Sequence, residues 1–332
     1  MSATAFVLAA GFGTRLKPLT LHRPKPLVPL CGVPALAYSL ALCARHGLTE
    51  VIVNAHYLAD QVQAWSGEHE GVTVTVNTEA PDILGTGGGL RAVRDQLAER
   101  FVVLNADVLH DVDLTALAAA VPDGGGAMAL RPHPSDAERY GVVAGDASGR
   151  VVKLSSVAVG PAEGDVAHDT HFTGIHALDR EALQRVPEGF ACIVRTAYKQ
   201  LVPLRRVGLL RHPGVWLDAG DPAAYLEANL DLLHDRVTLA LDPHPRAAVS
   251  RREGGGGHGE VPRVRLDGPV WIGHEARIGH DSHIDRSIVG HGAVLAPHTR
   301  LARCVVWDGV QVPPGDHRDT VFFADDGQVT PG

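Results

Sequence analysis

Two short runs near the start of the chain combine glycines with positive charge. They are Ala9-Ala10-Gly11-Phe12-Gly13-Thr14-Arg15 and Arg23-Pro24-Lys25-Pro26-Leu27. Glycines let backbone N–H groups approach an anion closely, and several such groups in one turn form a nest of partial positive charge. Arg15 and Lys25 add full charges where a phosphoryl transfer develops negative charge. Residue types and spacing therefore predict a polyphosphate site.

The distribution of charge supports this prediction. The chain has a net charge of −8, yet no acidic residue precedes Glu50, whereas lysine and arginine occur five times before it. The glycines alone are less specific. They lack the third glycine of a dinucleotide fingerprint, and no Gly-Lys-Ser/Thr sequence supplies a Walker A loop. A tight strand-to-helix turn is the alternative interpretation of Gly11-x-Gly13.

A second glycine cluster and two aspartates could complete such a site. Leu84-Gly85-Thr86-Gly87-Gly88-Gly89 precedes a helix expected from Leu90, and bare backbone there suits a base, a ribose or a phosphate. A flexible loop is the alternative. Asp107 follows an apolar strand and Asp218 follows Trp216-Leu217, so the two carboxylates can converge on one Mg²⁺. Singly, each aspartate could instead be a turn or capping residue.

The elements that must position these residues alternate between strands and helices. Such alternation indicates a mainly parallel sheet with its ligand crevice at the carboxyl ends of the strands, where Gly11, Glu79 and Asp107 fall. We expect strands at Ala5–Ala9, Glu50–Asn54, Val72–Val76, Phe101–Asn105, Ala127–Arg131, Val142–Ala144 and Val151–Leu154, with a loop over Gly160–His171. We expect helices at Ala35–His46, Leu58–Trp65, Leu90–Arg100, Arg180–Arg185, Ile193–Leu201 and Pro222–His234.

The last third of the chain has a different pattern. Ser250–Glu260 contains four consecutive glycines and nothing to bury, which is typical of a flexible linker. Beyond it, short aliphatic runs such as Val270-Trp271-Ile272-Gly273 and Ala276-Arg277-Ile278-Gly279 recur about every six residues. This hexapeptide pattern predicts a parallel β-helix and says little about activity.

Length and composition exclude several classes. At 332 residues, the chain has room for roughly two domains, and 45% hydrophobic content fits an ordinary globular protein. The absence of a long basic run argues against a nucleic-acid polymer as partner. Cys31, Cys43, Cys192 and Cys304 form no CxxC pair, which favours reduced thiols in a cytoplasm. No apolar run reaches the ~18 residues of a membrane span, so we expect no membrane association.

Taken together, the motifs resemble those of the sugar-1-phosphate nucleotidylyltransferases. The resemblance rests, in order, on Gly11–Leu16, Pro24–Leu27, Leu84–Gly87, Asn105–Asp107 and Trp216–Gly220, and it covers roughly residues 3–235. It implies a Rossmann-like, mainly parallel α/β nucleotidyltransferase domain at 1–240. A Gly-rich linker at 241–262 and a short left-handed parallel β-helix at 263–332 would follow. Homo-oligomer contacts through the β-helix are also expected.

The resemblance implies that an NTP and a sugar 1-phosphate yield an NDP-sugar and pyrophosphate by in-line attack on the α-phosphorus. Arg15 would hold the leaving phosphates and Lys25 would bridge the two substrates, while Asp107 and Asp218 would hold Mg²⁺. The residues implied to bind the nucleotide are Ala9, Ala10, Gly11, Gly13, Thr14, Arg15, Glu79, Gly85, Thr86, Gly87 and Gly88. Those implied to bind the sugar are Asn105, Lys153, Thr173 and Gly174.

The sequence departs from the family in two places that concern the sugar. The family's Glu-Lys-Pro is replaced in the stretch Lys153-Leu154-Ser155-Ser156-Val157-Ala158, and Phe172-Thr173-Gly174 replaces Asn-Ala-Gly. Lys153 is a candidate substitute for the missing lysine. We favour a mannose-1-phosphate guanylyltransferase-like enzyme using GTP. The alternatives are an N-acetylmuramate-1-phosphate or other hexose-1-phosphate uridylyltransferase, and a catalytically silent regulatory subunit that binds a nucleotide sugar.

Histidines gather in the repeat region. Those beyond residue 250 are His258, His274, His280, His283, His291, His298 and His317. A β-helix histidine can act as a base in acyl transfer, and histidine is a common metal ligand. We expect these histidines to serve structural contacts and contacts between subunits rather than acyl transfer or metal binding.

Overall fold

The computed structural model describes residues 3–241, 264–324 and 327–331. The chain divides into two compact units that are each assembled from separate segments. The first comprises Met1–Phe12, Ser39–Ala106 and His110–Trp216, and the second comprises Gly13–Tyr38, Asp107–Leu109 and Leu217–Gly332. The predicted linker at 241–262 lies outside the described residues, apart from residue 241.

The first unit is built on one mixed sheet. The strands are β1 (Ala3–Leu8), β4 (Glu50–Ala55), β5 (Gly67–His69), β6 (Val72–Thr78), β7 (Leu97–Asn105), β9 (Gly126–Pro132), β10 (Val142–Asp146), β11 (Val151–Leu154), β12 (Ala158–Val159), β13 (Val166–Asp179) and β14 (Val207–Arg211). Their order is β12-β11-β10-β13-β7-β1-β4-β6-β5, with β9 pairing β13 and β14. β7, β1, β4 and β6 are parallel, whereas β13 is antiparallel to β7.

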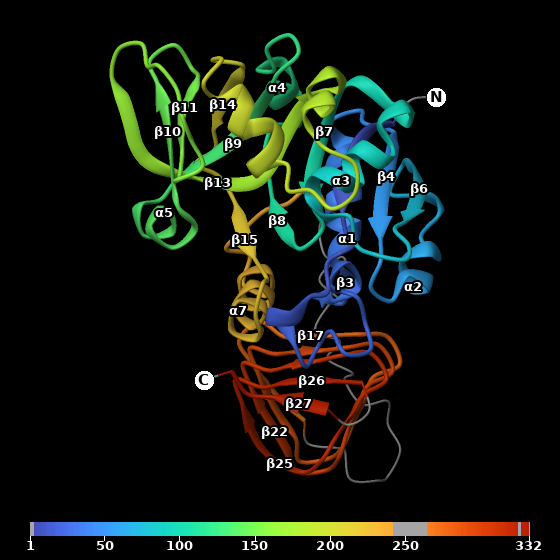
Figure 1. Cartoon of the computed structure of the whole chain (residues 1–332). Helices are drawn as coiled ribbons and strands as arrows, with labels where there is room; N and C mark the ends of the chain where they lie inside the picture. Colours follow the sequence, from blue (N-terminus) through green and yellow to red (C-terminus); the bar gives the residue numbers. More distant parts are fainter. Residues whose placement is uncertain (1–2, 242–263, 325–326, 332) are drawn as a thin grey trace. The chain divides into compact units, whose positions relative to one another are not determined.

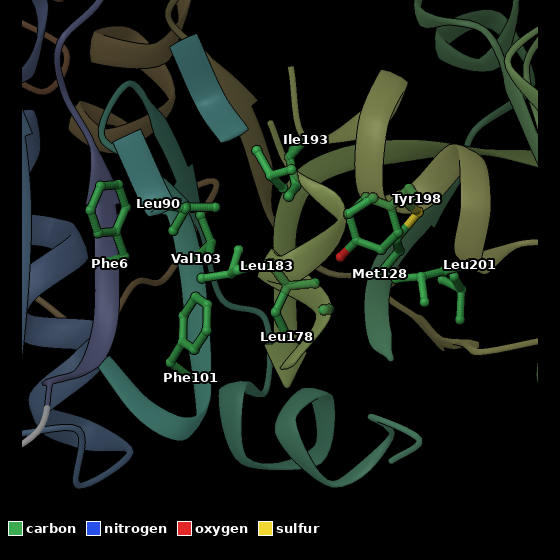
Figure 2. Close-up of a cluster of buried hydrophobic side chains, with 14 of the residues drawn as sticks. Phe6, Leu90, Phe101, Val103, Met128, Leu178, Leu183, Ile193, Tyr198 and Leu201 are labelled. Atoms are coloured by element: carbon green, nitrogen blue, oxygen red, sulfur yellow. The ribbon is translucent and has the colours of Figure 1, made fainter. Parts of the chain in front are cut away.

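The central strands are buried on both faces. Ala5, Phe6 and Val7 in β1 have no exposed surface, which is why this strand is a continuous apolar run rather than an alternating one. Figure 2 shows Phe6, Phe101 and Leu90 in the cluster that fills one side of the sheet, and it extends to Tyr198. Phe6, Ile52 and Val103 anchor β1, β4 and β7 in this core.

Helices and single turns join these strands. They are α1 (Ala35–Arg45), α2 (Ala59–Gln63), α3 (Gly85–Ala92), α4 (Leu114–Ala119), α5 (Pro134–Tyr140), α6 (Lys199–Leu201) and α7 (Pro222–Leu233), with the 3-10 turns η1 (Thr14–Leu16), η2 (Lys25–Leu27), η3 (Arg94–Gln96) and η4 (Arg180–Arg185) and the π-helical turn η5 (Val194–Tyr198). The side chain of Asp221 caps α7 by accepting from Ala224 N, and Pro222 occupies the first turn. Among the described residues, no helix is long and apolar enough to cross a membrane.

Two local expectations are wrong. The helix expected over Leu90–Arg100 begins at Gly85 and ends at Ala92, and β7 has begun by Leu97. Arg100 pairs with Asp179 of β13, so strand pairing outweighs the helical propensity of this stretch. The loop expected over Gly160–His171 is already strand β13 from Val166, because that strand pairs with both β9 and β10.

The C-terminal region forms the predicted parallel coils (Figure 1, orange to red). Its strands are β16 (Arg265–Asp267), β17 (Trp271–Ile272), β18 (Arg277–Ile278), β19 (His283–Asp285), β20 (Ile288–Val289), β21 (Val294–Leu295), β22 (Thr299–Ala302), β23 (Val305–Val306), β24 (Gln311–Val312), β25 (Gly315–Arg318), β26 (Val321–Phe323) and β27 (Gly327–Val329). They stack as β16-β19-β22-β25, β17-β20-β23-β26-β27 and β18-β21-β24, and all these pairs are parallel except β26 with β27. Three short strands per coil are what a hexapeptide period produces.

Two small sheets of two strands each are separate from the larger ones. The strands β2 (Pro29–Leu30) and β3 (Val33–Pro34) form a hairpin between η2 and α1. β8 (Val108–His110) pairs with β15 (Trp216–Asp218). Because Asp107 directly precedes β8 and Asp218 ends β15, this pairing positions the two predicted metal ligands on neighbouring strands.

Candidate active site

Each of the two predicted catalytic cations pairs with one of the two aspartates. Lys25 Nζ contacts Asp107 Oδ2, and Arg15 Nη1 lies 3.9 Å from Asp218 Oδ2. The Lys25 side chain is 12% exposed, whereas that of Arg15 is 60% exposed. The first pair is therefore fixed in a partly buried setting, and Arg15 remains accessible to an incoming anion.

The donor chemistry of this group fits a hard divalent cation. Asp107 and Asp218 offer carboxylate oxygens from adjacent strands, and Mg²⁺ is typically bound by one or two carboxylates together with phosphate oxygens. A β-carbon on Gly220 would lie 2.7 Å from Asp218 Oδ1 and 3.1 Å from Arg15 Nη2. Only glycine leaves room for the Asp218 carboxylate at this turn.

The first glycine turn leaves β1 directly. Ala9 and Ala10 are buried, whereas Phe12 is 46% exposed. Gly13 has φ +61°, and a β-carbon there would lie 2.9 Å from Thr20 Cγ2, so both conformation and packing require glycine. The 3-10 turn η1 then presents Thr14 and Arg15.

Two hydrogen-bonded side chains, Asn54 and Glu79, hold the backbone at the start of this turn. The sequence predicted only Glu79 as a site residue. Asn54 Oδ1 accepts a hydrogen bond of 2.7 Å from Ala9 N, and Asn54 Nδ2 donates to Glu79 Oε1 at 2.7 Å. The second carboxylate oxygen, Glu79 Oε2, accepts from Leu84 N at 2.7 Å. Glu79 is 3% exposed. Asn54 and Glu79 therefore link the first glycine turn, at Ala9, to Leu84, where the second glycine cluster begins.

Sequence reasoning found Glu79 but missed Asn54. The available signal was a polar side chain directly after the apolar run 51–53 of β4. A buried amide costs free energy unless it is hydrogen-bonded, so it must have partners. Here the partners include the backbone of the predicted phosphate turn.

The second glycine cluster lies inside α3 rather than before a helix. Gly87 N and Gly88 N both donate to Ala191 O, at 2.8 and 3.3 Å. A β-carbon on Gly88 would lie 2.1 Å from Gly189 O. These glycines therefore allow α3 to pack closely on the 189–193 segment. Their contact with a base, together with that of Gly85 and Thr86, stays a prediction.

Three of the four predicted sugar-site residues come together. A β-carbon on Gly174 would lie 2.3 Å from Asn105 Nδ2, and Gly174 has φ +86°. Thr173 is 2% exposed and its hydroxyl donates to Ala129 O at 2.8 Å, so its side chain serves the fold. Lys153 lies apart from them on β11, which β10 separates from β13.

An aromatic cluster that sequence reasoning did not identify adjoins Thr173. Trp216 Nε1 donates to Thr173 O at 2.9 Å. The rings of Trp216 and His171 are 4.9 Å apart, and His171 stacks on Tyr140 at 5.4 Å. Burial lowers the pKa of His171. The three rings come from three separate segments of the chain, so no local sequence pattern predicts the cluster.

The β-helix histidines form small groups at the coil corners. His280, Asp281 and His298 are exposed, and their ligand atoms lie within 4.8 Å of one another. His274 stacks on His291 with ring centroids 5.4 Å apart. The first group has the donor set of a surface metal site, and the second extends the contacts between successive coils.

The glycine turn after β1 and the paired cations and carboxylates are consistent with a nucleotidyltransferase. The chain matches the nucleotidyl transferase family over residues 4–235 and belongs to that family.

Similar proteins cover most of the chain. A probable mannose-1-phosphate guanylyltransferase 2 of Oryza sativa subsp. japonica is 30% identical over 93% of this chain and 82% of its own length. The mannose-1-phosphate guanylyltransferase of Mycobacterium tuberculosis is 30% identical over 94% and 81%. A UTP–glucose-1-phosphate uridylyltransferase of Synechocystis sp. is 25% identical over 94% and 84%.

Proposed function

We propose that this protein is a sugar-1-phosphate nucleotidylyltransferase that converts GTP and mannose 1-phosphate to GDP-mannose and pyrophosphate. The observation that carries the proposal is the pairing of Lys25 with Asp107 and of Arg15 with Asp218. Two pairs, each of a cation and a carboxylate, suit a reaction that moves negative charge between phosphates. The names of the two 30% identical relatives favour guanylyl transfer to mannose 1-phosphate.

The chemistry follows from the charges of these side chains. The sugar phosphate oxygen attacks the α-phosphorus, and the bond to the β-phosphate breaks. Lys25 offsets charge between the two substrates at the reacting centre, and Arg15 stabilises the departing pyrophosphate. Asp107 and Asp218 would hold Mg²⁺, which neutralises phosphate charge when bound. Most of the rate enhancement then comes from positioning and charge stabilisation.

Residues of the first unit bind the rest of the substrates in this proposal. Ala9–Gly11 and the α3 glycines receive the nucleotide, with Asn54 and Glu79 fixing the backbone between them. Asn105 and Gly174 face the sugar. Lys153 is a candidate for the sugar phosphate in place of the missing Glu-Lys-Pro lysine.

A uridylyltransferase is the second candidate, because one relative over most of the chain carries that name. Pyrophosphate release should be measured with four NTPs against a panel of sugar 1-phosphates that includes mannose, glucose and N-acetylmuramate derivatives. The highest kcat/KM with GTP and mannose 1-phosphate is the expected result. A preference for UTP would favour the uridylyltransferase over the guanylyltransferase. No turnover with any pair of substrates would favour the silent regulatory subunit.

We also propose that 1–240 and 263–332 act as a catalytic domain and a β-helix, with homo-oligomers formed through the latter in the cytoplasm. All four cysteines are free, which suits a reducing compartment. Light scattering coupled to size exclusion should give a mass above that of one 35.1 kDa chain. A monomer at micromolar concentration argues against the oligomer.

A further inference from the structure

The segment that carries Lys25 packs on the β-helix within one compact unit. Residues 13–38 and 217–332 both belong to the second unit. The Arg23 guanidinium carbon lies 4.8 Å from the centroid of the Trp307 ring, which is a cation–π distance. Trp307 directly follows β23 and is 3% exposed. A buried ring of the β-helix therefore meets the chain two residues before Lys25.

A directional chain of hydrogen bonds starts at the same ring. Trp307 Nε1 donates to Tyr225 Oη at 2.9 Å, and Tyr225 Oη donates to Pro29 O at 2.5 Å. An indole N–H can only donate, so the hydroxyl must accept from it and send its single proton to Pro29. Tyr225 has no exposed surface. The chain thus runs from the β-helix through α7 to the β2–β3 hairpin in one fixed orientation.

The turn of that hairpin is held from two further sides. Cys31 N donates to Asn229 Oδ1 at 2.8 Å, and Asn229 lies one helical turn after Tyr225 on α7. A β-carbon on Gly32 would lie 2.5 Å from Trp271 Cη2, so the Trp271 ring packs directly on the turn. Side chains from α7 and the β-helix therefore contact the chain on both sides of Lys25, at Arg23 and over 29–32.

We propose that Trp307 and Tyr225 are positioning residues for nucleotidyl transfer, which fix the Arg23–Pro34 segment so that Lys25 stays on Asp107. The proposal rests on the proposed function of Lys25. Catalysis by positioning is sensitive to small movements, since a displacement of about 1 Å can cost on the order of 10²-fold in rate. Neither side chain needs to touch a substrate to have this effect.

Three substitutions separate the contacts. Trp307→Phe keeps an aromatic ring under Arg23 and removes the indole N–H, Tyr225→Phe removes the hydroxyl, and Trp307→Leu removes both ring and N–H. We expect kcat to fall roughly 10-fold in each phenylalanine variant and roughly 100-fold in Trp307→Leu. The KM for each substrate should stay within about threefold, because binding groups are retained. The two phenylalanine changes combined should cost no more than either alone, since both break one chain.

Leu301→Ala is the matched control. Leu301 is 1% exposed and belongs to β22, in a different sheet of the β-helix from β23. It should lower the melting temperature without changing kcat at 25 °C. A loss of kcat in this control as large as in Trp307→Phe would reduce Trp307 to a general structural role and overturn the proposal.

Hydrogen exchange of the full-length chain gives a readout independent of turnover. Trp307→Phe should speed amide exchange in residues 25–34, where Cys31 N is bonded to Asn229. Unchanged exchange there, or a kcat within about twofold of the unsubstituted protein, overturns the positioning role. If the unsubstituted protein turns over no substrate pair, the proposed function fails, and exchange in 25–34 still decides whether Trp307 holds the segment.

Discussion

Replacing Gly89 with alanine tests whether the Asn54–Glu79 pair fixes the two glycine segments. Gly89 lies inside α3, where alanine ordinarily stabilises a helix by about 1 kcal/mol relative to glycine. Here the new β-carbon would lie 2.5 Å from Glu79 Oε1 and 3.1 Å from Asn54 Nδ2. The helix backbone cannot move freely, because Gly88 packs on Gly189 O. The carboxylate must therefore shift away from its donors.

The magnitude follows from the bonds that are lost. A hydrogen bond to a charged group contributes about 1.5–3 kcal/mol, and loss of one outweighs the helix gain of about 1 kcal/mol by about 0.5–2 kcal/mol. At about 2–4 °C per kcal/mol for a domain of this size, the melting temperature should drop by roughly 1–8 °C. The KM for the NTP should rise as well, because Ala9 N and Leu84 N lose their fixed acceptors.

The matched comparison is the same substitution in a Glu79→Ala background. With the carboxylate gone, Gly89→Ala should be neutral or stabilising, so its effect reverses sign between the two backgrounds. Differential scanning fluorimetry of the four proteins of this cycle gives the answer. A Gly89→Ala protein that melts above the unsubstituted one refutes the steric argument, and equal shifts in both backgrounds refute the role of Glu79.

Three further outcomes are expected. Asp218→Asn should raise the Mg²⁺ concentration for half-maximal rate, and unchanged rates at limiting Mg²⁺ would exclude a metal role. Lys25→Ala should lower kcat about 10²–10³-fold, whereas the exposed Lys199→Ala should not; equal losses in kcat and NTP affinity would make Lys25 a binding residue only. Burial lowers the pKa of His176 to about 3 from 6.5. As the pH falls, His176 is therefore protonated in the unfolded chain before it is protonated in the folded one, so the free energy of unfolding decreases below about pH 6.5. The melting temperature of His176→Gln should fall less between pH 6.5 and 4.5, and parallel curves would contradict this.

The motifs that sequence reasoning found share one physical property. Gly13, Gly174 and Gly220 each mark a backbone position where a side chain would collide with a neighbour, and this requirement is visible in the residue type alone. The hexapeptide period is equally local, since one coil repeats the next. The glycines therefore marked the candidate turns and the period marked the β-helix, while the alternation of strands and helices predicted the parallel sheet.

The sequence did not predict which distant segments pair with one another. Asn54 and Glu79 can each be noticed singly, but only the parallel pairing of β4 with β6 brings them together. The start of β7 likewise depends on distant strands, because Leu97 pairs with Ala3 of β1 and Arg100 pairs with Asp179 of β13. Tertiary pairing is decisive in these places, so local propensity misassigns them.

The second unit combines early and late segments of the chain, which affects when the site can form during synthesis. Residues 13–38 leave the ribosome early, yet the aromatic ring that meets Arg23 belongs to residue 307. At about 5–20 residues per second, translation separates these partners by tens of seconds. A nascent chain can thus assemble its central sheet well before its lysine-bearing segment acquires its final support. Catalytic competence would then appear only when the last coils have been made.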